Sequence, residues 1–169
     1  LPTSKGDNGG FGDRNSPTVL NAAVHAFQFW DGRAKDVEEQ AGGPITNPVE
    51  IAIPSKEFLV ARLKEVKEYQ EMFKAAFPEA KEPISYENVQ KSIAAFERTL
   101  MTPTAFDKYL QGDHSALTPE QRSGLKTFIN TGCTQCHTGP AVGGTMFQKF
   151  GVYADYRTLT HSKTDDKGK

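Results

Sequence analysis

Both cysteines of the chain lie in one motif, Cys133-Thr134-Gln135-Cys136-His137. A C-x-x-C-H motif is typical of covalent attachment of a c-type haem. Each thiol can form a thioether with a haem vinyl group, and on a helical turn His137 lies on the same side as Cys133, where its imidazole can bind the iron. A redox pair would require a βαβ context, and a zinc site a second pair of ligands; neither pattern occurs. We therefore predict one haem c at Cys133, Cys136 and His137.

Length and charge narrow the class of protein further. At 169 residues the chain is one full domain or two small ones, and its net charge of −1 gives no indication of nucleic acid or an anionic membrane as a partner. The sequence has no apolar run of roughly 18 residues, so no membrane span is predicted. The first residues do not form an export signal. Because haem attachment to this motif takes place outside the cytoplasm, we expect such a signal to have preceded residue 1.

Apolar periodicity predicts a mainly α fold with long loops. A helix that leads into C-x-x-C-H resembles the start of a cytochrome c-like haem domain, so we expect domains of that kind. Ser55 and Ser85 are expected to cap two helices, the second ended by Pro103, with a short helix through 69–73 between them. Thr118-Pro119-Glu120-Gln121 has the pattern of a capping box and predicts a helix that leads to Cys133.

The remaining segments are predicted to be irregular. Residues 1–17 are rich in Gly, Asp, Asn and Ser and are expected to form a loop. Residues 36–40 are predicted to form a helical turn that stops before Gly42-Gly43-Pro44. The stretch 47–54 is bracketed by prolines and is expected to be extended. Residues 105–113 are read as a link, and 161–169 as a polar, exposed tail.

Four blocks occur together in order and in register. They are Asn15-Ser16-Pro17-Thr18-Val19-Leu20-Asn21, Gln28-Phe29-Trp30-Asp31-Gly32-Arg33, Asn47-Pro48-Val49-Glu50 and Gly132-Cys133-Thr134-Gln135-Cys136-His137. With these blocks the sequence resembles bacterial dihaem cytochrome c peroxidase over nearly its whole length. In that family an N-terminal haem domain reduces hydrogen peroxide in the periplasm, and a C-terminal haem domain takes electrons from a small cytochrome c or cupredoxin.

The resemblance implies an organisation for this chain. Residues 1–104 would be the remainder of the N-terminal, peroxidatic haem domain, and residues 105–169 the start of the C-terminal, electron-transfer domain. The full-length protein would carry two haems c, one of them attached within this sequence, and calcium. A homodimer is compatible with the resemblance.

It also implies roles for five residues, each of which has a plainer alternative. Glu50 would be the distal acid–base group, or else an ordinary surface Glu. Phe29 and Gln40 would line the same pocket, or else be core and solvent-facing. Trp30 would lie between the two haems as an electron route, or else anchor the core. Asn15 would be a calcium ligand, or else a turn residue.

Three departures from the family pattern are visible. The sequence lacks the first C-x-x-C-H and the downstream distal methionine, so we interpret it as an internal piece of a protein of roughly twice this length. Asp7 stands near the place where many members have a histidine that caps the peroxidatic iron. The other candidate iron ligands are interpreted as core, loop or surface residues: His25, Met101, His114, Met146 and His161.

Two other functions remain open at this point. One is the related dihaem oxidase that matures a tryptophan-derived quinone, which typically has a tyrosine in place of the missing methionine. The other is a monohaem electron carrier, if the chain is complete. The Trp-Asp-Gly-Arg and Pro-Val-Glu blocks argue against the carrier, since a simple carrier fold does not need them.

Overall fold

The computed structural model describes residues 3–149 and 151–161, and in these ranges the chain is helical. Its helices, in order, are η1 (Ala22–Val24), α1 (Val37–Thr46), α2 (Lys56–Lys64), α3 (Lys67–Ala76), α4 (Tyr86–Glu97), α5 (Ala105–Leu110), α6 (Pro119–Asn130), η2 (Cys133–Gln135) and α7 (Tyr156–Thr160). Over the same residues β-structure is limited to two isolated bridges, Lys5 with Phe11 and Gln28 with Ala34. The predicted mainly α class with long loops is confirmed. The tail 162–169 lies outside the described residues.

The predicted helix starts are present. The Ser55 hydroxyl accepts the Phe58 N–H at 3.1 Å, and the Ser85 hydroxyl accepts the Asn88 N–H at 3.2 Å. At α6, Thr118 forms the predicted capping box with Gln121. Each cap pairs backbone N–H groups that have no partner inside the helix, which is why these short polar residues decide where the helices begin.

The predicted end of the first helix is wrong, because α1 continues through Gly42, Gly43 and Pro44. Gly42 lies where α1 packs against α4: a Cβ placed there would be 2.3 Å from Nε2 of Gln90. The Tyr86 hydroxyl donates a hydrogen bond to the Gly42 carbonyl oxygen. The glycine therefore permits close approach of two helices and does not end one, a use that the sequence pattern alone does not distinguish.

Three smaller predictions are also wrong. The stretch 47–54 is a compact turn in which the N–H groups of Glu50 and Ala52 both donate to the Asn47 carbonyl at 3.0 Å. The Asn47 side chain accepts the Val49 N–H at 3.2 Å, and this Asx turn overrides the extended preference next to proline. Helix α4 ends at Glu97, before Pro103 is reached, and part of the expected link 105–113 forms α5.

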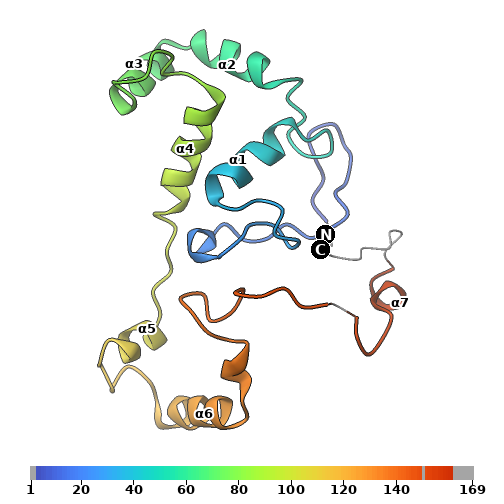
Figure 1. Ribbon diagram of the computed structural model, residues 1–169, viewed down its shortest axis with the longest axis vertical. Helices are drawn as coiled ribbons and strands as arrows, with labels where there is room; N and C mark the ends of the chain where they lie inside the picture. Colours follow the sequence, from blue (N-terminus) through green and yellow to red (C-terminus); the bar gives the residue numbers. More distant parts are fainter. Residues whose placement is uncertain (1–2, 150, 162–169) are drawn as a thin grey trace.

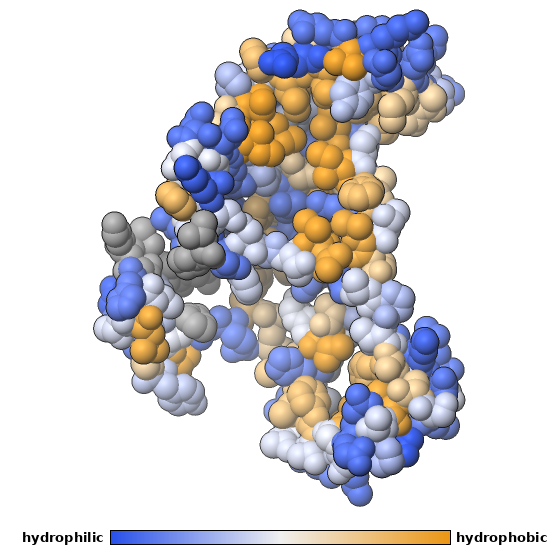
Figure 2. All heavy atoms as spheres, turned by 180° about the vertical axis from the view of Figure 1, so that it is seen from behind, coloured by the Kyte–Doolittle hydropathy of each residue, from blue (hydrophilic) through white to orange (hydrophobic). Residues whose placement is uncertain are grey.

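Helices α1 to α4 lie in one half of the molecule (Figure 1). They hold most of the buried apolar side chains of the described residues. One cluster consists of Ile45, Phe73, Ile84 and Val89, and a second joins Ala22, Val37 and Ala94. Viewed from behind, apolar side chains also reach the surface over this part of the molecule (Figure 2). Beyond residue 104, Leu117 is the one buried apolar residue in the described ranges. None of the helices described has the length and hydropathy needed to cross a bilayer.

Two helical glycines provide a test of the α1–α4 contact. Gly42→Ala should lower the free energy of unfolding by about 1–3 kcal/mol, because its Cβ displaces Gln90, whose amide donates to the Glu38 carbonyl at 2.9 Å. Gly124→Ala in α6 meets no atom within 4 Å and should raise stability by about 0.5–1 kcal/mol. Urea unfolding followed by circular dichroism measures both. Equal effects of the two substitutions would contradict the close packing at Gly42.

Candidate functional site

The C-x-x-C-H segment forms a tight helical turn after α6. The Cys136 and His137 N–H groups both donate to the Cys133 carbonyl oxygen, at 3.2 and 3.0 Å. Gly132, with φ of 86°, turns the chain out of α6 and into η2. Both thiols are unpaired. The three side chains of the predicted haem attachment are therefore presented by one turn, as the sequence spacing requires.

His137 is oriented by the backbone that follows it. Its Nδ1 lies 3.1 Å from the Val142 carbonyl oxygen, and Phe128 of α6 packs edge-on against the imidazole with ring centroids 5.7 Å apart. A proton on Nδ1 that donates to this carbonyl leaves Nε2 with its lone pair, which is the form an iron ligand needs. The donor set fits a haem c: two free thiols, one oriented imidazole and an aromatic ring beside it.

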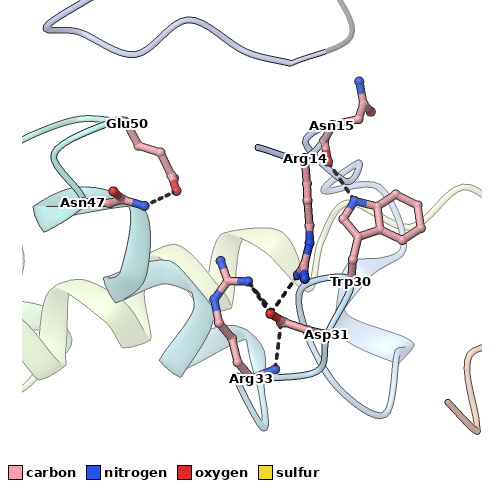
Figure 3. A network of polar contacts seen from close by, with 7 residues as sticks. All are labelled: Arg14, Asn15, Trp30, Asp31, Arg33, Asn47 and Glu50. Atoms are coloured by element: carbon pink, nitrogen blue, oxygen red, sulfur yellow. Dashed lines mark hydrogen bonds and ion pairs between the residues drawn. The ribbon is translucent and has the colours of Figure 1, made fainter. Parts of the chain in front are cut away.

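Apart from the C-x-x-C-H turn, a hollow lies at Glu50, between the N-terminal loop and the turn after α1. It has a volume of about 710 Å³, which is in the range of small-molecule sites. Its lining includes Asp7, Arg14 and Glu50. The Glu50 carboxylate accepts a hydrogen bond from the Asn47 amide at 2.7 Å (Figure 3). Glu50 is thus partly buried, held in place and open to the hollow.

The N-terminal loop packs directly on the Glu50 turn. The Asp7 N–H donates to the Glu50 carbonyl at 2.7 Å, and the Gly6 N–H donates to the Gly10 carbonyl at 2.8 Å. A Cβ at Gly6 would lie 2.2 Å from the Val49 carbonyl oxygen, so only glycine permits this approach. The loop therefore brings Asp7 to the same hollow as Glu50.

Asp31 is the centre of the polar network beside Trp30 (Figure 3). It accepts from the Arg14 guanidinium at 2.8 Å and from the Arg33 guanidinium at 3.0 Å. Partial burial acts to raise the pKa of Asp31, but the hydrogen bonds from Arg14 and Arg33 outweigh it, so the pKa lies below its ordinary value. The network fixes the loop that carries Trp30, whose indole N–H donates to the Asn15 carbonyl at 2.7 Å.

The remaining predicted site residues are dispersed. Trp30 is 64% exposed, which does not fit a core anchor. The Arg33 guanidinium carbon lies 3.5 Å from the centroid of the Phe29 ring. The Phe29 ring also faces Gly43 of α1. Phe29 and Gln40 are partly buried, and they lie outside the described lining of the Glu50 hollow. Asn15 is exposed and meets the indole through its backbone.

One residue that fixes this geometry was missed from the sequence. Asn21, at φ 60°, is hydrogen-bonded to the segment between α4 and α5. Its N–H donates to the Leu100 carbonyl at 2.9 Å. Its side-chain amide donates to the Thr102 hydroxyl at 2.6 Å and accepts the Thr102 N–H at 2.8 Å. Its position at the end of the first matched block was the only available signal. Asn adopts the left-handed region more readily than most residues other than glycine, which suits it to this turn.

Together, these features define a helical protein with a C-x-x-C-H turn that fits a haem c and a separate hollow whose lining includes Asp7 and Glu50. Residues 1–115 match the family described as di-haem cytochrome c peroxidase. The chain is 47% identical over 153 residues to the cytochrome c551 peroxidase of Pseudomonas aeruginosa, covering 90% of this chain and 44% of that protein. It is 44% identical over 159 residues to the cytochrome c551 peroxidase of Nitrosomonas europaea, covering 94% and 47%.

A solved structure shows the same fold. The crystal structure of a MauG-like protein associated with microbial copper homeostasis superposes with a TM-score of 0.77 at 25% identity, covering 99% of this chain and 56% of that one. The chain belongs to the di-haem cytochrome c peroxidase family. It spans less than half the length of the two curated relatives.

The contact between the N-terminal loop and the Glu50 turn can be tested at two glycines. Gly6→Ala should speed hydrogen exchange of the Asp7 amide roughly fivefold, because the new Cβ separates the loop from Glu50 and removes a hydrogen bond worth about 1 kcal/mol. Gly12→Ala, whose Cβ would meet nothing closer than 3.9 Å, is the matched control. Unchanged exchange in Gly6→Ala would show that the loop does not rest on this turn.

The Asp31 network predicts a pH dependence. A carboxylate with a lowered pKa adds stability that is complete above the unfolded value of 3.8 and is lost as the pH falls through the folded value. Asp31→Asn should therefore cost about 1–2 kcal/mol at pH 7, and this difference from wild type should shrink below pH 4. Urea unfolding at several pH values measures it, with the exposed Glu79→Gln as control. A difference that does not change with pH would contradict the ion pairs.

Proposed function

We propose that this chain is part of a periplasmic enzyme that reduces hydrogen peroxide to water with electrons from a small redox protein. The single observation that carries the proposal is the position of Glu50, held by Asn47 at the edge of a hollow of about 710 Å³. Membership of the di-haem peroxidase family supports it. In this scheme two electrons and two protons convert one peroxide molecule into two waters.

Glu50 would act as the general acid–base group that transfers the proton within the peroxide. A carboxylate beside bound peroxide can accept a proton from the nearer oxygen and return it to the farther one, which then leaves as water. The Asn47 amide donates to the Glu50 Oε1 atom and orients the carboxylate, and Glu50 is part of the lining of the hollow. Phe29 and Gln40 would contribute more remotely, Phe29 through its contact with Gly43 on α1 and Gln40 from the same helix.

The electron-transfer haem c would be held by this chain. Cys133 and Cys136 would form the thioethers and His137 Nε2 would bind the iron, while the second haem of the proposed dihaem enzyme would be held by other residues. The haems supply the one-electron chemistry that joins the donor to the peroxide. Trp30, exposed on its loop, would lie on the route between them, and the donor would be a cytochrome c or a cupredoxin.

Other features of the resemblance are also part of the proposal. The non-helical segment between α4 and α5 supports a division into a peroxidatic part, 1–104, and an electron-transfer part, 105–169. The Asn15 side-chain oxygen would be a calcium ligand; its backbone carbonyl already accepts the Trp30 indole N–H. A homodimer would be the assembled form.

A second candidate is the MauG-type dihaem oxidase, which the superposition on a MauG-like protein favours. The peroxidase has the stronger support, since the curated relatives at 44–47% identity are both cytochrome c551 peroxidases. The monohaem carrier has the weakest support. Residues 1–115 lie before the C-x-x-C-H turn and match the di-haem peroxidase family, and a simple carrier does not need them.

Glu50→Gln in the full-length holoprotein should lower peroxide turnover about a hundredfold or more, since the amide cannot carry the proton. Stopped-flow measurement of donor oxidation reports the rate. A pyridine haemochrome assay should find two haems per chain in both proteins. Glu68→Gln, on the exposed face of α3, is the matched control and should be fully active. Undiminished turnover in Glu50→Gln, or one haem per full-length chain, would overturn the proposal.

A further inference from the structure

The Phe147 side chain packs against the loop that carries Trp30. A Cβ at Gly32 would lie 2.3 Å from Cζ and 2.6 Å from Cε1 of Phe147, so the ring rests directly on the glycine backbone. The Phe147 and Phe27 rings also pack together, with centroids 5.4 Å apart and planes inclined by 37°. Gly32 is buried and has φ of 63°, a conformation and a closeness that favour glycine.

The Gly32 loop is fixed at its base and carries Trp30 near its tip. The Gln28 N–H donates to the Ala34 carbonyl at 2.8 Å, and the Gln28 side chain donates to the Ala22 carbonyl at 2.8 Å. The Gly32 N–H closes the tip on the Phe29 carbonyl at 3.2 Å. Because the loop is closed by these hydrogen bonds, we expect a contact at Gly32 to influence the position of the Trp30 indole, two residues away.

The segment that carries Phe147 is itself tied to His137. Val142 accepts from the His137 imidazole, and a Cβ at Gly143 would lie 3.4 Å from the same Nδ1 atom. The next residue, Gly144, approaches the other part of the chain, since its Cβ would lie 3.1 Å from Nδ1 of His25. Figure 1 shows this segment returning from η2 to lie beside the N-terminal loops. The nine residues 138–146 thus connect His137 to Phe147, which packs on the Trp30 loop.

We propose that Phe147 is a positioning residue for electron transfer: by packing on Gly32 and Phe27 it fixes the distance between the His137 turn and the Trp30 loop. The inference rests on the proposed function, because it assumes that electrons pass between these two sites. Phe147 touches neither the peroxide nor the iron in this scheme. Its effect is on the geometry of the route.

The test uses the full-length holoprotein and two readouts. Phe147→Ala should speed hydrogen exchange of the amides in 28–32 roughly threefold to tenfold, the range expected for loss of one aromatic pair. Flash reduction should show interhaem electron transfer slowed by a similar or larger factor, with haem content and both reduction potentials unchanged. Phe147→Tyr should restore both readouts. Tyr153→Ala, at a fully exposed ring six residues away, is the control.

A double-mutant cycle shows whether the ring and the glycine act on each other. Gly32→Ala should impair interhaem transfer less in the Phe147→Ala background than alone, because the clash with the ring is gone and only the backbone strain at φ 63° remains. Additive effects of Gly32→Ala and Phe147→Ala on the transfer rate would contradict a direct contact between the two residues. So would amide exchange in 28–32 of Phe147→Ala that equals the exchange in Tyr153→Ala. Faster exchange with an unchanged transfer rate would overturn the positioning role. The hydrogen-exchange result does not depend on peroxide turnover, so failure of the proposed function would be seen separately.

Discussion

The packing of α1 against α4 is the contact on which the site residues depend. The two helices approach closely because Gly42 has no side chain, and Tyr86 and Gln90 of α4 then bond backbone carbonyls of α1. Helix α1 leads directly into the turn that holds Glu50, and its Gly43 faces the Phe29 ring. One helix contact therefore sets the position of the proposed acid–base group and of the loop that carries Trp30. The ion pair of Arg98 with Glu38 adds little to it, since both side chains are partly exposed.

The part of the chain after residue 104 is organised differently. In the described ranges it buries a single apolar residue, Leu117, too little for a stable core of its own. Phe128 instead packs against His137, and the helix caps and glycine turns set the path of the backbone. A covalently attached haem c would give this part the large apolar surface around which small cytochrome domains pack. The C-x-x-C-H turn would then have a structural role as well as a redox role.

The candidate site could be predicted from the sequence only in part. The C-x-x-C-H turn was predictable because its geometry is local: three residues on one turn fix their own arrangement. Glu50, Trp30 and Asn15 were named through the register of four blocks, and nothing local to each residue would have selected them. Asn21 and Phe147 were missed because their partners, Thr102 and Gly32, are distant in sequence. No periodicity or propensity encodes such contacts.

The sequence by itself determined the helical class, the starts of three helices and the haem-attachment turn, because caps and short turns depend on residues a few positions apart. Only the tertiary structure decided how glycines and prolines are used. Gly42 and Gly43 lie inside a helix because α4 and Phe29 approach them, and the proline-bracketed stretch at Glu50 folds into a turn because Asn47 supplies the hydrogen bonds. Gly124 also lies inside a helix, although no atom comes within 4 Å of an added Cβ there, so the presence of a glycine does not show whether a neighbour packs against it. Whether a partner approaches is a property of the packed chain, not of the local sequence.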